Sequence, residues 1–257
     1  MAKFTYKFAM DIFNIKIEFD SNACREAIDR CIDENGKGYI CVVDFNVLTI
    51  TQQDPEYRNI VYGSYLNVCD GSTIAAMANF IYGTNYRVYT GPQIFEGMVE
   101  RKNVKQLLLG NTEETYNKIK NELKNRGIDS SHLMYMPVPF ASVDEFDYPT
   151  IAEQIKEMNP NVIWVSLGAP KQERFMNRLL PYLDKGLMFG IGAAFNFYVG
   201  EIRQPKFHIG ALRFIWVDRI IHEPKKQFGR IRLAMKAYPI LFVDELRKKR
   251  KLKKKQK

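Results

Sequence analysis

Val162-Ile-Trp-Val-Ser-Leu-Gly-Ala-Pro-Lys-Gln-Glu-Arg174 predicts a buried strand that turns directly into a helix. Val162–Ser166 is apolar or small throughout, Gly168 permits a tight turn, and Pro170 stands where a first helical residue belongs. The unpaired N–H groups and positive dipole of such a helix N-terminus suit a phosphate. An ordinary strand-to-helix corner with a solvated polar first turn explains the pattern equally well. The candidate substrate-binding residues of this corner are Gly168, Lys171, Gln172 and Glu173.

Strands and helices alternate on both sides of this stretch. Further strands are expected at Tyr39–Phe45, Tyr65–Cys69, Gln106–Leu109, Leu133–Met136 and Leu187–Ile191. Helices are expected from Ser21 or Asn22 to Asn35, and at Ser72–Tyr82, Glu113–Arg126, Tyr148–Asn159 and Pro170–Leu180. This alternation predicts a doubly wound, mostly parallel, Rossmann-like α/β sheet. A short hairpin is expected before it, within Lys3–Phe19.

The positive charge is concentrated at the C-terminal end of the chain. Residues 203–257 hold 18 of the 38 Lys and Arg side chains but 4 of the 29 acidic ones, so their net charge is +14 and that of the remainder is −5. We therefore expect an α/β catalytic domain over residues 1–200 and a basic helical appendage over residues 201–257. Within the appendage, helices are expected at Ala211–Ile221 and Glu223–Ala237, with an interruption at Pro239 and a flexible basic run at Lys248–Lys257.

The appendage has more than one possible partner. Its basic run suits an anionic membrane, where each Lys or Arg contributes about 1 kcal/mol, and nucleic-acid phosphates are the competing partner. The apolar residues from Trp216 to Val243 form either a helix packed on the core or an interfacial helix on a membrane. Some of the arginines are spaced to reach a ligand cleft, and the candidates are Arg213, Arg219 and Arg230.

The sequence indicates a reducing, cytoplasmic location. The four cysteines show no Cys-x-x-Cys spacing, the first residues do not resemble a signal peptide, and no apolar run is long enough to span a bilayer. The three histidines lack ligand spacing, and Asp-x-Asp, a Walker loop and Gly-x-Gly-x-x-Gly are all missing from the sequence. We therefore expect no metal and no cofactor.

Polar residues follow the predicted strands where ligands of doubly wound sheets bind. Asp70 and Gly71 follow one strand, and a carboxylate beside a helix N-terminus is kept ionised, as a general base requires. The alternative role of Asp70 is a helix N-cap. Asp44 and Asn46 follow another strand and either orient a sugar hydroxyl or form an Asx-turn. A further corner is Gly190–Phe197, which contains Gly192 and Asn196.

Taken together, these corners resemble those of the WecG/TagA/CpsF family of bacterial glycosyltransferases. Leu167-Gly-Ala-Pro-Lys-Gln-Glu173 is close to the Gly-x-Pro-Lys-Gln-Glu signature of that family. Asp70-Gly71, Gly190–Phe197 and Glu223-Pro224-Lys225 add to the resemblance, which spans about residues 39–235 in a consistent order.

The resemblance implies an inverting, metal-independent transferase at the inner face of the cell membrane. Its donor would be a UDP-linked N-acetylmannosamine-type sugar, and its acceptor a polyprenyl-diphosphate-linked GlcNAc used for cell-envelope or capsular polysaccharide. Asp70 matches the proposed catalytic base of the family, and Asn46 matches an asparagine that lines the sugar site. Lys171, Gln172 and Glu173 match the nucleotide side. A homo-oligomer is possible, and nucleic acid is not expected as a partner.

Three positions depart from the family pattern. Asp44 replaces a usual threonine and is a possible second catalytic acid, Gln93 replaces an acid, and Asn196 replaces an aspartate. The donor therefore stays open between N-acetylmannosamine, its uronic acid and another hexose derivative. Two alternatives to this function are a non-catalytic nucleic-acid-binding module and a different Rossmann-like nucleotide enzyme.

Overall fold

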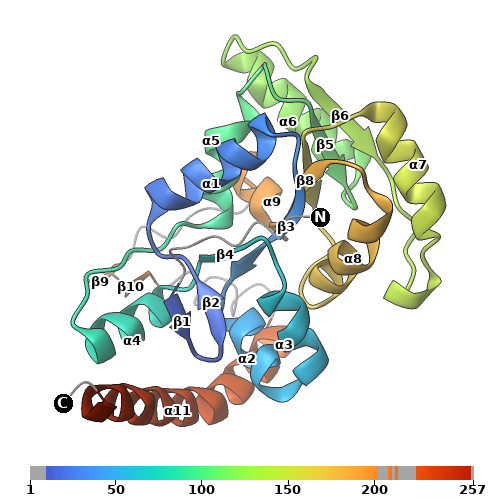
Figure 1. Ribbon diagram of the computed structural model, residues 1–257. Coiled ribbons are helices and arrows are strands. Elements are labelled where there is room, and N and C mark those ends of the chain that lie inside the picture. The colour runs from blue at the N-terminus through green and yellow to red at the C-terminus, as the bar shows by residue number, and fades with distance from the viewer. Residues whose placement is uncertain (1–9, 202–207, 210–211, 214–223, 256–257) are drawn as a thin grey trace.

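A computed structural model describes residues 10–201, 208–209, 212–213 and 224–255 of the 257-residue chain. Its centre is a six-stranded, all-parallel sheet in the order β4-β3-β8-β7-β5-β6 (Figure 1). The strands are almost entirely buried, as expected for a parallel sheet covered on both faces. Their bounds are β3 Lys37–Val43, β4 Leu66–Cys69, β5 Gln106–Leu109, β6 Leu133–Met136, β7 Val162–Val165 and β8 Gly186–Gly190.

Helices cover both faces of this sheet, and alternate strand residues pack against each layer. On β3, for example, Ile40 and Val42 belong to one hydrophobic cluster, whereas Cys41 and Val43 belong to the other. The first cluster is covered by α1 Ser21–Asp33, α5 Gly91–Val99, α6 Glu113–Asn125 and α9 Ala194–Tyr198. The second is covered by α2 Phe45–Gln53, α3 Pro55–Tyr62, α4 Ser72–Tyr82, α7 Tyr148–Met158 and α8 Lys171–Leu179. Short 3-10 helices lie at η1 Val143–Glu145 and η2 Leu180–Tyr182.

The sheet confirms the predicted doubly wound α/β class. The predicted strands are all present within a residue or two, and the N-terminal hairpin is formed by β1 Met10–Ile12 and β2 Ile15–Ile17. A second small antiparallel pair, β9 His208–Ile209 with β10 Leu212–Arg213, was not expected. The helix after the hairpin is capped by Asp20 rather than by Ser21 or Asn22, because the Asp20 carboxylate accepts hydrogen bonds from the N–H groups of Asn22 and Ala23.

Helices α2, α3, α5 and α9 were not predicted. Helix α2 is rich in β-branched residues, which have low helix propensity, but Asp44 caps it as it leaves β3. Helix α5 opens on Gly91-Pro92, a typical turn pair, yet Thr90 and Gln93 form a capping box that starts the helix. Side-chain caps thus start α2 and α5, although propensity and turn residues alone did not predict helices there.

The C-terminal residues form one helix, α11 Pro224–Lys255, with Pro239 inside it. The expected interruption at Pro239 is therefore wrong, and so is the expected flexible run, since residues up to Lys255 are helical. The helix packs beside α2 and α4, where Ala237 and Leu241 are buried (Figure 1). Of the expected helix Ala211–Ile221, the described residues Leu212–Arg213 form strand β10 instead, and the others lie outside the described residues. Among the described helices, none is long and apolar enough to cross a membrane.

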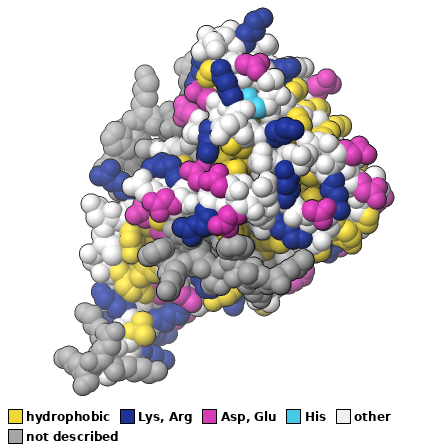
Figure 2. Space-filling model, turned by 45° about the horizontal axis from the view of Figure 1, so that its top comes forward, with side chains coloured by type: hydrophobic (Ala, Val, Ile, Leu, Met, Phe, Trp, Pro, Cys, Tyr) yellow, Lys and Arg dark blue, Asp and Glu magenta, His cyan; other side chains and the backbone are white. Residues whose placement is uncertain are grey.

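Charge is distributed differently over the body and over α11. Figure 2 shows Lys or Arg side chains intermingled with Asp or Glu side chains across the visible face of the body. Surface ion pairs such as Arg126–Glu122 and Lys118–Glu114 join neighbouring turns of α6. The last turns of α11 project beyond the body at the lower left, where Lys and Arg side chains surround a hydrophobic one (Figures 1 and 2). Helix α11 holds 13 Lys and Arg but 2 acidic residues, so most of the net charge of the appendage lies on this helix.

Candidate active site at the carboxyl edge of the sheet

Asp44 and Asp70 leave adjacent strands at paired positions. Val43 is the register partner of Cys69, so each acid is the first residue beyond the paired strand ends. The backbone N–H groups of Asp70 and Gly71 both donate to the Val43 carbonyl, at 3.0 and 3.3 Å. Both side chains are half-buried. The sheet thus places two carboxylates side by side at the edge where ligands of such folds bind.

Asp70 is not the cap of the helix that follows it. The N-cap of α4 is Gly71, which has no side chain to bond the first turn, so the alternative role of Asp70 as that cap is wrong. The Asp70 carboxylate instead accepts a hydrogen bond from the Gly91 N–H, at 3.1 Å, in the first turn of α5. It therefore lies between the N-termini of α4 and α5, whose partial positive charge stabilises an anion.

Asp44 serves the fold as the N-cap of α2. Its carboxylate accepts a hydrogen bond from the Val47 N–H at 2.9 Å, which satisfies one unpaired donor of that helix. Asn46 lies in the same first turn and is half-buried. The sequence motif Asp44-Phe-Asn46 therefore places an acid and an amide at the same strand end, one of them fixed by capping.

The Lys171-Gln-Glu173 triplet divides between surface and interior. Gly168 has φ +75°, which confirms the predicted tight turn. The Gly168 N–H donates to Gln172 Oε1 at 3.2 Å, and Gln172 Nε2 donates to Glu173 Oε1 at 2.8 Å. The Gln172 and Glu173 side chains are buried, so their hydrogen bonds stabilise this turn from the protein interior. Lys171 alone reaches outward, over the rings of Phe140 and Phe146, at 5.3 and 5.2 Å from the ring centroids.

Glu173 is fully buried, and this burial raises the pKa of its carboxyl to about 7. The Gln172 amide and the Tyr57 hydroxyl oppose the rise, whereas the negative charge of Asp44 adds to it. The charge of Asp44 thus acts on the Glu173 carboxyl, although Asp44 follows β3 and Glu173 lies in the first turn of α8.

Two further candidates lie after β8. Gly192 has φ +53°, and its carbonyl accepts a hydrogen bond from Ser166 Oγ at 2.7 Å, which ties the end of β8 to the end of β7. Asn196 lies in the short helix α9 and is half-buried. Of the three candidate arginines, Arg213 lies in β10 and Arg230 in α11, and Arg219 lies outside the described residues.

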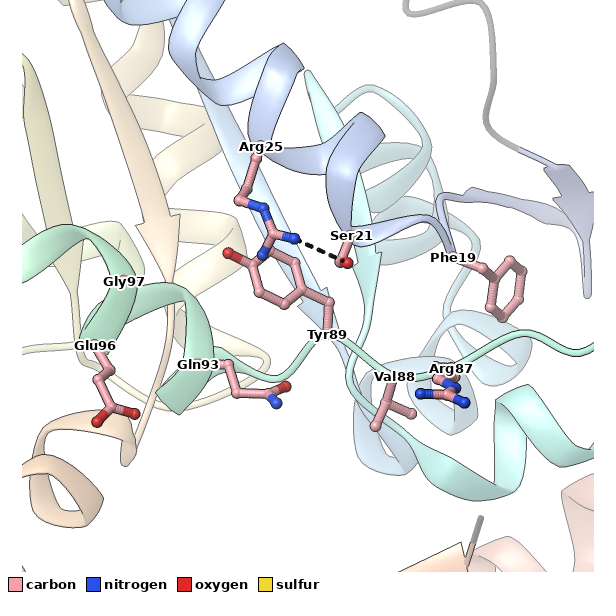
Figure 3. Close-up of a pocket in the computed structure, with 9 residues that line it drawn as sticks. All are labelled: Phe19, Ser21, Arg25, Arg87, Val88, Tyr89, Gln93, Glu96 and Gly97. Atoms are coloured by element: carbon pink, nitrogen blue, oxygen red, sulfur yellow. Dashed lines mark hydrogen bonds between the residues drawn. The ribbon is translucent and has the colours of Figure 1, made fainter.

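Gln93 has a structural role and also lines a cavity. Its side-chain oxygen accepts from the Thr90 N–H at 2.9 Å, which completes the capping box of α5. The cavity measures about 430 Å³ and lies between the start of α1, the segment before Thr90, and α5 (Figure 3). Gly91, in the same turn of α5 as Gln93, binds Asp70, which does not itself line the cavity.

Sequence reasoning missed Arg25 and Arg87, which flank this cavity (Figure 3). The guanidinium of Arg25 lies 5.3 Å from the centroid of the Tyr89 ring and donates to Ser21 Oγ at 3.3 Å. Arg87 lies just before the Thr90-Gly91 corner in the sequence, and this position could have marked it as a candidate site residue. Within the residues that the structure describes, no three His, Cys, Asp or Glu side chains are grouped so as to hold a metal ion.

Comparison with known proteins agrees with this geometry. A sequence profile described as "Glycosyl transferase WecG/TagA/CpsF family" matches residues 10–255. The chain belongs to this glycosyltransferase family. The match includes the two strand ends that carry Asp44 and Asp70, the Lys171-Gln-Glu173 corner, and all of α11. The family resemblance inferred from the motifs is therefore confirmed, and so is the inference that the protein is an enzyme.

Members of the family from two bacteria are similar to the chain over most of its length. One from Bacillus subtilis (strain 168) is 24% identical over 203 residues, which is 75% of each chain. One from Staphylococcus aureus (strain MW2) is 23% identical over 255 residues, which is 93% of each chain. Both are named N-acetylglucosaminyldiphosphoundecaprenol N-acetyl-beta-D-mannosaminyltransferase. The non-catalytic alternative, a nucleic-acid-binding module, is not compatible with membership of an enzyme family.

Proposed function

We propose that the protein transfers an N-acetylmannosamine-type sugar from UDP to a polyprenyl-diphosphate-linked GlcNAc. The observation that carries this proposal is the pair Asp44 and Asp70 at adjacent strand ends of a WecG/TagA/CpsF-family fold. The names of the Bacillus and Staphylococcus relatives support the acceptor and the sugar. A cell-envelope or capsular polysaccharide is the expected destination of the product.

In the proposed reaction, an acceptor hydroxyl oxygen attacks the anomeric carbon of the donor sugar. The bond from that carbon to the β-phosphate oxygen breaks, and its electron pair leaves with UDP. Asp70 takes the proton of the attacking hydroxyl, as a general base does. Because attack occurs opposite the leaving group, the configuration inverts, and an α-linked donor gives the β linkage that the names of the relatives state.

The departing diphosphate needs positive charge, which we assign to the chain itself rather than to a metal. The N-terminus of α8 offers N–H groups and dipole, and Lys171 lies in its first turn. Arg213, Arg219 and Arg230 of the appendage remain candidates for closing over UDP. Metal independence and the use of UDP are both parts of this proposal that the transfer assay tests.

We also propose that the enzyme works as a peripheral protein at the inner face of the cell membrane. Helix α11 carries large apolar side chains that face solvent, with Met235 73%, Ile240 63% and Leu252 57% exposed. Lys and Arg residues alternate with them along the same helix. Such a helix suits the boundary of an anionic bilayer, where the lipid-linked acceptor resides.

The test is a transfer assay with purified protein, a lipid-linked GlcNAc-diphosphate analogue and a panel of UDP-sugars, run with and without EDTA. We expect N-acetylmannosamine transfer that EDTA does not reduce. Loss of transfer with EDTA would refute metal independence alone. Failure of the folded protein to transfer any sugar from the panel would refute the proposed function.

A further inference from the structure

Tyr238 brings the C-terminal helix to the corner that holds Asp44. Its ring stacks on Phe45, with centroids 4.7 Å apart and planes inclined by 19°. Phe45 directly follows Asp44, and the Phe45 backbone nitrogen would lie 3.6 Å from a Cβ built on Gly71. Tyr238 therefore reaches the strand ends that carry both carboxylates, although it lies near the opposite end of the sequence.

The hydroxyl of Tyr238 is buried and has no hydrogen-bond partner in the described part of the chain. A buried polar group without a partner destabilises a fold by about 1–3 kcal/mol, so such groups are few in native proteins and call for an explanation. Packing against Phe45 requires only the ring, and a phenylalanine would provide it. The hydroxyl is thus able to bond a substrate without disturbing this packing.

The surroundings of this hydroxyl keep it protonated. Burial raises the pKa of Tyr238, and the negative charge of Asp44 raises it further. A protonated phenol donates one hydrogen bond and accepts others, which suits a sugar hydroxyl as partner. Asp44 directly follows β3, so the charge that acts on this hydroxyl belongs to the strand ends of the proposed site.

A polar clamp further along α11 fixes the position of Tyr238. Glu245, two helical turns later on the same helix face, is only 2% exposed. Its carboxylate accepts hydrogen bonds from the Phe13 N–H at 2.9 Å and from the Tyr82 hydroxyl at 2.6 Å. Leu241, between them, is buried. The helix is thus bound to the hairpin and to α4. These contacts fix the position of the Tyr238 ring against Phe45.

We infer that the Tyr238 hydroxyl is a substrate contact, which hydrogen-bonds a hydroxyl group of a hexose bound at the ends of β3 and β4. The inference rests on the proposed sugar-transfer function and deepens it. The sugar site is then complete only when α11 is docked, because one of its polar groups comes from that helix. Both substrates carry hexose hydroxyls, and separate measurements on donor and acceptor identify which one is bound.

The test compares Tyr238→Phe with the wild-type protein, because phenylalanine keeps the stacked ring and removes only the hydroxyl. We expect an unchanged or higher melting temperature, since the fold loses an unpaired buried group. We expect KM for either the UDP-sugar or the lipid-linked acceptor to rise about tenfold, because the variant loses one hydrogen bond to that substrate. Binding of each substrate is also measured by calorimetry, so that the effect on affinity is seen without turnover.

Tyr182→Phe is the matched control, because Tyr182 is a solvent-exposed tyrosine in η2, away from α11. It should leave both KM values unchanged. If the wild-type protein turns over and Tyr238→Phe shows the same kcat, KM and affinities for both substrates, the inference is wrong and the proposed function stands. If the wild-type protein neither binds nor transfers a sugar, both are wrong.

Discussion

The Asp70 carboxylate accepts a hydrogen bond from the backbone N–H of Gly91, at 3.1 Å, and so links the end of β4 to the first turn of α5. This contact orients the side chain that we propose as the base. It also explains why α5 is part of the site, although its sequence carries no catalytic group. The Thr90–Gln93 capping box fixes the same turn, so the base is held by a helix that is itself capped.

Asp44→Asn tests whether the second acid is a base or a structural cap. Asparagine caps helices about as well as aspartate, so the free energy of unfolding should change by less than about 1 kcal/mol. We expect turnover within about tenfold of wild type, because Asp70 remains in place. Steady-state transfer rates and urea denaturation provide the two measurements. A decrease in the transfer rate by a factor of 10² or more, with an intact fold, would instead identify Asp44 as the base.

Glu173→Gln tests the buried carboxyl of the Lys171-Gln-Glu173 corner. The pKa of Glu173 is about 7 in the folded protein, above its ordinary value of 4.5. Between these values the folded state holds a proton that the unfolded state has lost, so wild-type stability falls as pH rises from about 4.5 to about 7. The loss is on the order of 3 kcal/mol at neutral pH and above.

Glutamine mimics the protonated carboxyl, so the variant should lack this fall and exceed the wild type in stability at pH 8. At pH 5 the two should be similar. Urea denaturation at several pH values measures both profiles. Glu153→Gln, on the exposed face of α7, is the control and should keep the wild-type slope. Parallel slopes for wild type and Glu173→Gln would show that the carboxyl is ionised inside the folded protein.

Glu245→Ala tests the docking of α11. Removing this carboxylate leaves the Phe13 N–H and the Tyr82 hydroxyl without their acceptor, which should destabilise the protein by about 1–3 kcal/mol. Limited proteolysis should cut α11 faster than in wild type. Asp244→Ala is the neighbouring control, because Asp244 is exposed and its ion pair among the described residues is with Arg247 of the same helix. Equal rates of proteolysis for the two variants would show that Glu245 does not hold α11 against the hairpin and α4.

Ile240→Glu tests the membrane-facing role of α11. Ile240 is exposed, so the substitution should leave the fold intact while it places a charge at the bilayer boundary. Flotation with vesicles rich in anionic lipid should show weaker association than wild type, and added salt should weaken both. Tyr182→Glu, at an exposed position on η2, should float like wild type. If Ile240→Glu floats like the wild type, the part of α11 around Ile240 does not contact the membrane.

Apolar strands and their turn residues made the fold predictable. Val162–Ser166 followed by Gly168 gave strand, left-handed turn and helix in the order found, because buried parallel strands are continuous apolar runs. Helix α5 was missed because Gly91-Pro92 is typical of a turn, and only the Thr90–Gln93 pairing shows that a helix starts there. The continuity of α11 through Pro239 was missed because it depends on packing against α2 and α4.

The candidate site was predictable in place but not in detail. The strand ends located Asp44 and Asp70, since parallel strands end at one edge of a sheet. The burial of Gln172 and Glu173 was not predictable, because polar residues in a first helical turn are usually solvated, and here they bond each other and Gly168 instead. Tyr238 gave no local signal, because its position depends on a helix that docks from the far end of the chain.

The most direct test of the account is the rate of sugar transfer by Asp70→Asn, measured with the best UDP-sugar and the lipid-linked acceptor at saturating concentrations. Asparagine keeps the size of the side chain and an oxygen for the Gly91 N–H, but it cannot take a proton. We predict a loss of about 10² or more in kcat, with calorimetric UDP binding within a few-fold of wild type. Turnover within tenfold of wild type, by a folded variant that binds UDP, would contradict the assignment of Asp70 as the base.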